Sequence, residues 1–198
     1  MKKIMFNDRF GLTAAVLNGQ KTMTRRIVPS QYVPMIKDGL QGAALIEAQQ
    51  HGDAFREGEV VAVAQKYLDL RNCDAFYEAL SKADPYFPLE CIKGEKGAYN
   101  KMFVKAEWMP HRIRITDIKV ERLRDISDED CMREGLWRLA GTSLYHYDES
   151  ITRKGRNLYH TPREAFSALI DKVSGKRTWE RNPWVFAYSF ELERRARP

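Results

Sequence analysis

Arg112-Ile-Arg-Ile-Thr-Asp-Ile-Lys-Val-Glu-Arg-Leu123 is the stretch of this 198-residue chain that says most about its fold. Isoleucines at 113 and 115 alternate with charged residues, which is typical of a strand buried on one face. The alternation slips once, at Thr116-Asp117, where two polar residues are adjacent, and then resumes. Such a slip indicates a β-bulge, which bends a strand in the way that a small barrel requires.

The rest of the chain alternates short strands with single short helices. Further strands are expected at 2–6, 21–28, 59–64 and 184–192. Helices are expected before Gly19, at 35–48, at 73–82, between Ser127 and Gly135, and at 161–173. This order predicts an α+β fold, a small mixed β-barrel of about five or six strands with short flanking helices. The sequence lacks the glycine motifs of dinucleotide-binding and P-loop proteins.

The composition is that of a globular protein with a slight basic excess. Apolar residues make up 43% of the chain and aromatic residues 11%, enough for the core of one domain covering residues 1–198. The 33 basic and 27 acidic residues give a formal charge of +6, which favours an anionic partner only slightly.

We expect neither a metal site nor a membrane segment. The three cysteines lack C-x-x-C spacing and the four histidines are dispersed, so no disulfide framework, metal ligand set or cofactor is predicted. No run approaches the ~20 apolar residues that span a bilayer, and the first ten residues do not form a signal peptide. Cys131 is expected to face the core. Reduced thiols fit an intracellular protein, so we expect a cytoplasmic location.

The densest group of reactive side chains lies in Asn18-Gly-Gln-Lys-Thr-Met-Thr-Arg-Arg26. Like-charge repulsion from Arg25 and Arg26 should lower the pKa of Lys21. A partly neutral lysine could take a proton from Thr24 and make that hydroxyl a nucleophile. The same cluster could instead clamp a phosphate through its arginines, or form a solvated basic strand whose arginine stems cover apolar neighbours.

Lys21 and Thr24 can share a pocket only if the backbone between them turns. In a regular strand, side chains three residues apart point to opposite faces. Gly19, where the preceding helix should stop, makes such a turn feasible. We therefore expect a bend just past this glycine.

Two stretches interleave aromatic rings with positive charge, as nucleoside- and single-strand-binding proteins do. They contain Tyr99, Lys101, Phe103, Trp108, His111, Arg112 and Arg114, and Lys176, Arg177, Trp179, Arg181 and Trp184. The alternative is that the tryptophans belong to the core, which we favour for Trp184. Trp179 and Asn182, in the expected loop before the last strand, are better surface candidates. The predicted binding residues are Arg25, Arg26, Lys101, Arg112, Trp179 and Asn182.

Four blocks of the sequence resemble the ASCH domain family. They are Gly19-Gln-Lys-Thr-x-Thr-x-Arg26, Gly58-Glu-Val-Val61, the stretch from Val120 to Leu136, and Trp179-Glu-Arg-Asn-Pro-Trp-Val-Phe186, which is similar to phage-type and bacterial members. The likeness weakens at about 30–55 and 69–100, which we interpret as insertions. The resemblance implies a PUA-like β-barrel, a fold with RNA-binding relatives.

One small ASCH protein is an amidohydrolase of N4-acetylcytidine. Its motifs imply Thr24 as nucleophile, Lys21 as its activator and Glu134 as acid/base or orienting group. By itself, Glu134 is a carboxylate at the C-terminal end of a helix, where the helix dipole disfavours an anion. This chain is about twice as long as the small enzyme, and Arg25 stands where that enzyme has an apolar residue.

Three functions stay open at this stage. The first hypothesis is a nucleotide- or RNA-binding protein that uses a basic cleft at the barrel mouth. The second is an amidohydrolase acting on an acylated nucleobase or nucleoside. The third is a phage- or mobile-element-linked protein-interaction module. Likeness of fold transfers more readily than activity, so binding is placed first.

Overall fold

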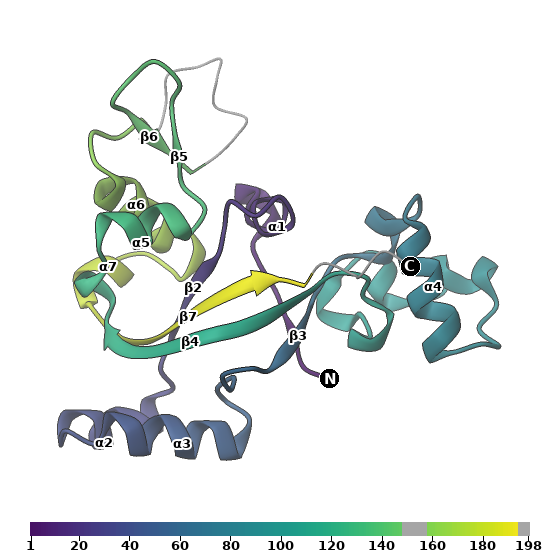
Figure 1. Cartoon of the computed structure of the whole chain (residues 1–198), viewed down its shortest axis with the longest axis horizontal. Helices are drawn as coiled ribbons and strands as arrows, with labels where there is room; N and C mark the ends of the chain where they lie inside the picture. The colour runs from purple at the N-terminus through teal and green to yellow at the C-terminus, as the bar shows by residue number, and fades with distance from the viewer. Residues whose placement is uncertain (148–157, 194–198) are drawn as a thin grey trace.

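The largest sheet is built from five strands of the part of the chain that the computed structural model describes, residues 1–147 and 158–193 (Figure 1). In sheet order they are β1 (Lys3–Ile4), β3 (Val60–Val63), β4 (Arg112–Arg122), β7 (Trp184–Leu192) and β2 (Met23–Ile27). β1 runs parallel to β3, and all other neighbours are antiparallel. Two further strands, β5 (Trp137–Arg138) and β6 (Tyr145–His146), form a separate small hairpin.

β4 and β7 are the long central pair, and they run side by side along their whole length in Figure 1. Their register shifts between Ile115 and Asp117, so the bulge predicted at Thr116-Asp117 is confirmed. Ile113 and Ile115 have no exposed surface, as the alternating pattern requires.

The predicted α+β class is confirmed, whereas closure of the sheet into a barrel is not. Within residues 1–147 and 158–193, β1 and β2 end the sheet and no ladder joins them. β1 spans only two residues, so it offers few backbone groups for a closing ladder. The five strands of this sheet agree with the predicted number.

Helices surround the sheet on several sides (Figure 1). They are α1 (Leu12–Leu17), α2 (Val33–Lys37), α3 (Gln41–His51), α4 (Asp74–Ala83), α5 (Asp128–Arg133), α6 (Pro162–Val173) and α7 (Thr178–Arg181). α5, α6 and α7 gather at the end of the sheet where β4 finishes and β7 begins. None of the helices in the described ranges is both long and apolar enough to cross a lipid bilayer.

The predicted helix starts are explained by their caps. Thr161 accepts a hydrogen bond from the Glu164 N–H, and the Glu164 carboxylate accepts one from the Thr161 N–H, which completes a capping box. Ser127 accepts from the Asp130 N–H at the start of α5. Gly39 separates α2 from α3, whereas Gly42 lies inside α3 and does not interrupt it.

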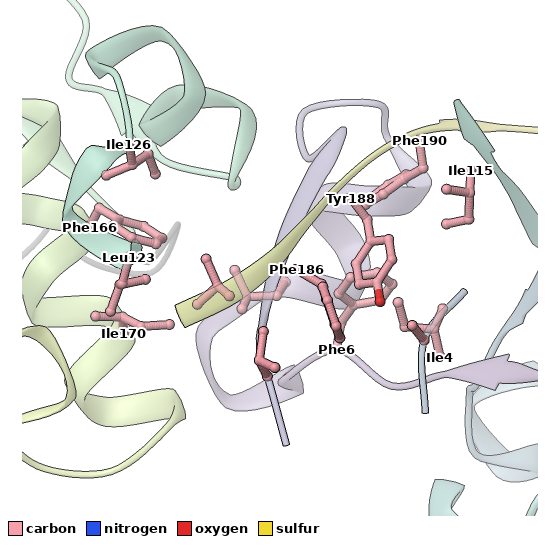
Figure 2. Close-up of a cluster of buried hydrophobic side chains, with 14 of the residues drawn as sticks. Ile4, Phe6, Ile115, Leu123, Ile126, Phe166, Ile170, Phe186, Tyr188 and Phe190 are labelled. Atoms are coloured by element: carbon pink, nitrogen blue, oxygen red, sulfur yellow. The ribbon is translucent and has the colours of Figure 1, made fainter. Parts of the chain in front are cut away.

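Two groups of side chains in the main core set the position of the site (Figure 2). Phe186, Tyr188 and Phe190 of β7 pack near Phe6. The second group contains Phe166 and Ile170 of α6 together with Leu123 and Ile126. The cavity described below lies between Phe6 and α6, since both line it.

The segments expected as insertions at 30–55 and 69–100 fold into ordered structure. The first contains α2 and α3, which lie on one side of the sheet in Figure 1. The second contains α4 and, with residues that flank it, builds a smaller core of its own around Tyr67, Phe76, Leu80 and Trp108.

Gly97→Ala tests how tightly this smaller core is packed. An alanine Cβ would lie 2.5 Å from Cε2 of Tyr67. The Tyr67 ring is buried, and its centroid lies 5.6 Å from that of Phe76 and 5.1 Å from that of Trp108. We expect the substitution to lower the free energy of unfolding by about 1–3 kcal/mol in urea melts. Gly94→Ala, which meets no atom within 4 Å, is the control and should cost less than about 0.5 kcal/mol. Equal effects would contradict close packing at position 97.

Candidate active site

A cavity of about 310 Å³ lies between the start of the chain, β2, the end of α5 and α6. Its wall brings together residues that are far apart in the sequence. They are Met5, Phe6, Asn7 and Leu12, then Lys21 and Thr24 to Ile27, then Glu134, and finally Phe166, Leu169, Ile170, Val173 and Ser174. All three residues that the sequence assigned to catalysis are among them.

The turn between α1 and β2 places Lys21 and Thr24 on the same cavity. Gly19 has φ 80°, and the Lys21 N–H donates to the Ala15 carbonyl at 2.8 Å. β2 begins only at Met23, so Lys21 lies before the strand and the strand's alternation does not apply to it. The bend that the pairing needs is present just past the glycine.

Lys21 and Glu134 form a buried ion pair. Nζ of Lys21 lies 2.6 Å from Oε2 of Glu134, and the two residues are 2% and 5% exposed. The same ammonium donates to the Glu134 carbonyl oxygen at 2.8 Å, at the C-terminal end of α5. A cation at this end compensates the helix dipole. The unfavourable position of the Glu134 carboxylate is therefore offset by the lysine that it binds.

Gly135 allows the end of α5 to pack directly on the lysine. Its φ of 98° lies in the left-handed region that favours glycine, and a Cβ there would be 3.3 Å from Cβ of Lys21. The glycine stop expected after Glu134 thus ends the helix and also makes room for the stem of Lys21.

Arg25 holds the other oxygen of the Glu134 carboxylate. Its Nη1 lies 3.1 Å from Oε1 of Glu134, while Nη2 lies 2.8 Å from Glu121 and 3.1 Å from Asp130. Burial opposes the charge of Arg25, but Glu134 and Glu121 outweigh it and raise its pKa above the usual range. Carboxylates therefore occupy this guanidinium, which we predicted to bind a ligand.

Burial also shapes the ionisation of Lys21. Loss of solvent lowers the pKa of Lys21 from its usual value, Glu134 opposes that fall, and the charges of Arg26 and Arg25 add to it. The like-charge effect expected from the sequence is thus present but secondary to burial. An amine with a lowered pKa, held in place by a carboxylate at 2.6 Å, is suited to acid–base work.

Thr24 and Arg26, in the cavity wall, each have a polar group without a partner in the described part of the chain. Thr24 is 5% exposed, and its hydroxyl makes no hydrogen bond to any residue in 1–147 or 158–193. Nη2 of Arg26 donates to the Met5 carbonyl at 2.7 Å, but its Nε is buried and has no hydrogen-bond partner in the same ranges. Burial lowers the pKa of Arg26. The residues of the cavity wall therefore include a hydroxyl and a guanidinium N–H that no described protein group occupies.

Four of the predicted binding residues do not line this cavity: Lys101, Arg112, Trp179 and Asn182. Lys101 donates to the Phe6 carbonyl and pairs with Asp8 at 2.8 Å, so it braces the segment at the cavity rim. Arg112 lies at the start of β4, in register with Ala62.

The remaining two have structural contacts near α6. Trp179 packs edge-on against Phe166 with ring centroids 6.1 Å apart, and the guanidinium of Arg163 lies 5.3 Å from its ring. Oδ1 of Asn182 accepts from the Arg124 N–H at 2.8 Å. Trp184, placed in the core from the sequence, is only half-buried, although it packs against the core.

The sequence reasoning missed the α6 wall and the two carboxylates that share Arg25. Asp130 could have been found, because it stands four residues before Glu134 and so shares its helix face. The contact of Glu121 with Arg25 could be predicted only from the register of β4 against β7 and of β7 against β2, which the sequence does not reveal. The apolar residues of α6 looked like ordinary core positions.

The described residues offer neither a reactive thiol at Cys131 nor a cluster of metal ligands. Cys131 is fully buried, and burial raises its pKa to about 12, so its thiol stays protonated. No group of three or more His, Cys, Asp or Glu residues that could hold a metal ion occurs in 1–147 and 158–193. A larger, shallower depression of about 850 Å³ over residues 138–144 has no acidic residue in its wall.

The likeness to the ASCH family rests on the sequence motifs alone. Comparison with protein-family models, with curated proteins and with solved structures finds no match to this chain. Its function is therefore argued from the geometry of the cavity.

Proposed function

We propose that the cavity hydrolyses the amide bond of an N-acylated nucleobase or nucleoside, such as N4-acetylcytidine. One observation carries the proposal: the buried Lys21–Glu134 pair, at 2.6 Å, shares its cavity with the Thr24 hydroxyl, which has no hydrogen-bond partner in 1–147 and 158–193. The resemblance to the ASCH family supports the same three roles, and a PUA-like barrel is part of the same proposal.

The chemistry begins with Lys21 in its neutral form, held next to the Glu134 carboxylate. The Thr24 oxygen attacks the acyl carbon, and the hydroxyl proton passes to Nζ of Lys21. The tetrahedral intermediate collapses, the C–N bond breaks, and the departing nitrogen takes the proton back. Water then attacks the threonine ester with Lys21 as base, which releases the carboxylic acid and restores the hydroxyl.

The charges around the cavity favour a neutral substrate. The cations of Lys21 and Arg25 face the carboxylates of Glu121, Asp130 and Glu134. Arg26 is the one cation of the cavity wall that has no ion pair within the described chain. An acylated base carries no formal charge, so a site with balanced charges suits it better than a polyphosphate.

The volume of the cavity also suits one small molecule. At about 310 Å³ it lies at the lower end of the range for ligand pockets, about 300–1,000 Å³. A base and its acyl group can enter such a space, whereas a folded RNA can present only one extruded nucleotide to it.

The direct test is acetate release from N4-acetylcytidine by the purified full-length chain. We expect stoichiometric cytidine and acetate, followed by liquid chromatography and an enzymatic acetate assay. Acetanilide serves as a control for non-specific amide cleavage. Absence of acetate at enzyme concentrations comparable to the substrate would overturn the proposed activity.

The rate should rise with pH, because only neutral Lys21 can accept the proton of Thr24. Burial lowers the folded pKa of Lys21, so the neutral fraction grows at a lower pH than for a free lysine, whose pKa is about 10.4. We expect kcat/KM to increase tenfold per pH unit below an apparent pKa under that value, then to level off. Lys21→Arg should remove the rising limb, since arginine stays protonated. A flat profile for the native chain would contradict the role of Lys21 as base.

Binding of a nucleotide or of RNA without turnover is the second candidate. It is favoured by Arg26, whose buried Nε has no partner within the described chain and could donate to a phosphate or a base carbonyl. Affinity for a single-stranded oligonucleotide should then fall with salt, with a slope near −0.7 per phosphate contact. Salt-independent binding would argue against this candidate and leave the hydrolase intact.

A further inference from the structure

One wall of the cavity is aliphatic. Leu169, Ile170 and Val173 of α6 line it, and Val173 follows Leu169 by four residues and Ile170 by three, so it shares a helix face with both. Leu169 and Ile170 are buried, whereas Val173 is 39% exposed and stands at the mouth. None of these side chains can donate or accept a hydrogen bond, so this wall contributes only apolar contacts.

The mouth is apolar as well. Met5, Ile27 and Val173 line the cavity and are 38%, 45% and 39% exposed. Met5 follows β1, Ile27 ends β2 and Val173 ends α6, so the three come from separate parts of the chain. Large apolar side chains that converge at the mouth of a cavity mark a place where an apolar group becomes buried on binding.

The opposite side of the cavity offers aromatic and polar groups. The Arg26 guanidinium lies 5.9 Å from the ring of Phe6, and Asn7 adds an amide. Planar guanidinium and ring surfaces stack on nucleobases, and amide and guanidinium groups bind base edges. A base therefore fits the side of Phe6 and Arg26, and its acyl substituent fits the aliphatic side.

We infer that the preferred substrates carry an apolar acyl group longer than acetyl, held by Leu169, Ile170 and Val173. The inference rests on the proposed amide hydrolysis and specifies its substrate class. An acetyl group brings a single methyl to this wall, whereas each additional buried methylene adds binding free energy that can be used in the transition state.

The test compares N4-acetyl-, N4-butanoyl- and N4-hexanoylcytidine as substrates of the full-length chain. We expect kcat/KM to be about tenfold higher for butanoyl than for acetyl, from two further buried methylenes. The hexanoyl compound should be at least as good as the butanoyl one, since the mouth is apolar.

Val173→Asp places a charge at the aliphatic end of the cavity, at a position exposed enough to keep the helix folded. It should reduce the ratio of kcat/KM for the butanoyl substrate to kcat/KM for the acetyl substrate from about ten to about one. The matched control is Ile46→Asp on α3, which is 57% exposed and lies outside the cavity wall. It should leave the ratio at about tenfold.

The outcomes separate the two proposals. If N4-acetylcytidine is hydrolysed but kcat/KM stays constant or falls as the acyl group lengthens, the preference for a longer acyl group is wrong. The proposed amide hydrolysis is then unaffected. If kcat/KM rises with acyl length and Val173→Asp does not change that rise, α6 is not the wall that binds the acyl group. Hydrolysis of none of the three compounds overturns the proposed function, and this inference with it.

Discussion

Glu134→Ala is expected to lower the free energy of unfolding by about 3–5 kcal/mol. Removing one partner of a buried ion pair leaves the other as an uncompensated charge in a medium that solvates it poorly. Here the loss would strand Lys21, which is 2% exposed, and would remove one of the three carboxylates around Arg25. No other ion pair of Lys21 exists within the described residues.

Urea melts followed by tryptophan fluorescence and circular dichroism measure this effect. Glu129→Ala, an exposed carboxylate on the same helix, is the control and should cost less than about 1 kcal/mol. The double variant Glu134→Leu with Lys21→Met should recover much of the loss, because apolar residues of similar size can replace a buried pair. A loss below about 1 kcal/mol for Glu134→Ala would contradict the ion pair.

Thr24→Val should reduce turnover of N4-acetylcytidine by at least about 10³-fold with little change in stability. The substitution keeps the branched shape that suits a strand and removes the proposed nucleophile. The Thr24 hydroxyl makes no hydrogen bond within the described chain, so its loss leaves no partner unsatisfied. Catalysis and folding are thereby separated at one position.

Thr22→Val is the matched control for this experiment. Thr22 lies two residues earlier, outside the cavity wall, and its hydroxyl accepts from Nε of Arg133 at 3.4 Å. Turnover should stay within a few-fold of the native chain. Activity of Thr24→Val within tenfold of the native value would rule out the threonine as nucleophile. Direct attack by water activated by Lys21 would then be the mechanism to test.

Local patterns predicted most of the elements. The bulge at Thr116-Asp117, the capping box at Thr161 and the helix stop at Gly19 each depend on residues within a few positions of one another. Closure of the sheet depends on pairing between β1 and β2, at opposite ends of the sheet order, and no local pattern encodes it. Because β1 and β2 do not pair in the described residues, the predicted barrel is not confirmed.

The candidate site was predictable to a lesser degree. Lys21 and Thr24 could be chosen because they are close in sequence and follow a helix stop. Glu134 came only from a family resemblance, since 113 residues separate it from Lys21. Lys101 and Trp179 were chosen for their residue types, and their side chains contact the protein itself, around Phe6 and Phe166.

By itself, the sequence determined most of the strands and helices, where β4 bends and where the chain turns before Lys21, because near neighbours along the chain fix these features. Only the tertiary structure decided that Glu134 would bind both Lys21 and Arg25, and that α6 would supply the aliphatic wall. Ion pairing and burial depend on distance in space and on exclusion of water. The chain acquires both only when α5 and α6 pack against the end of the sheet.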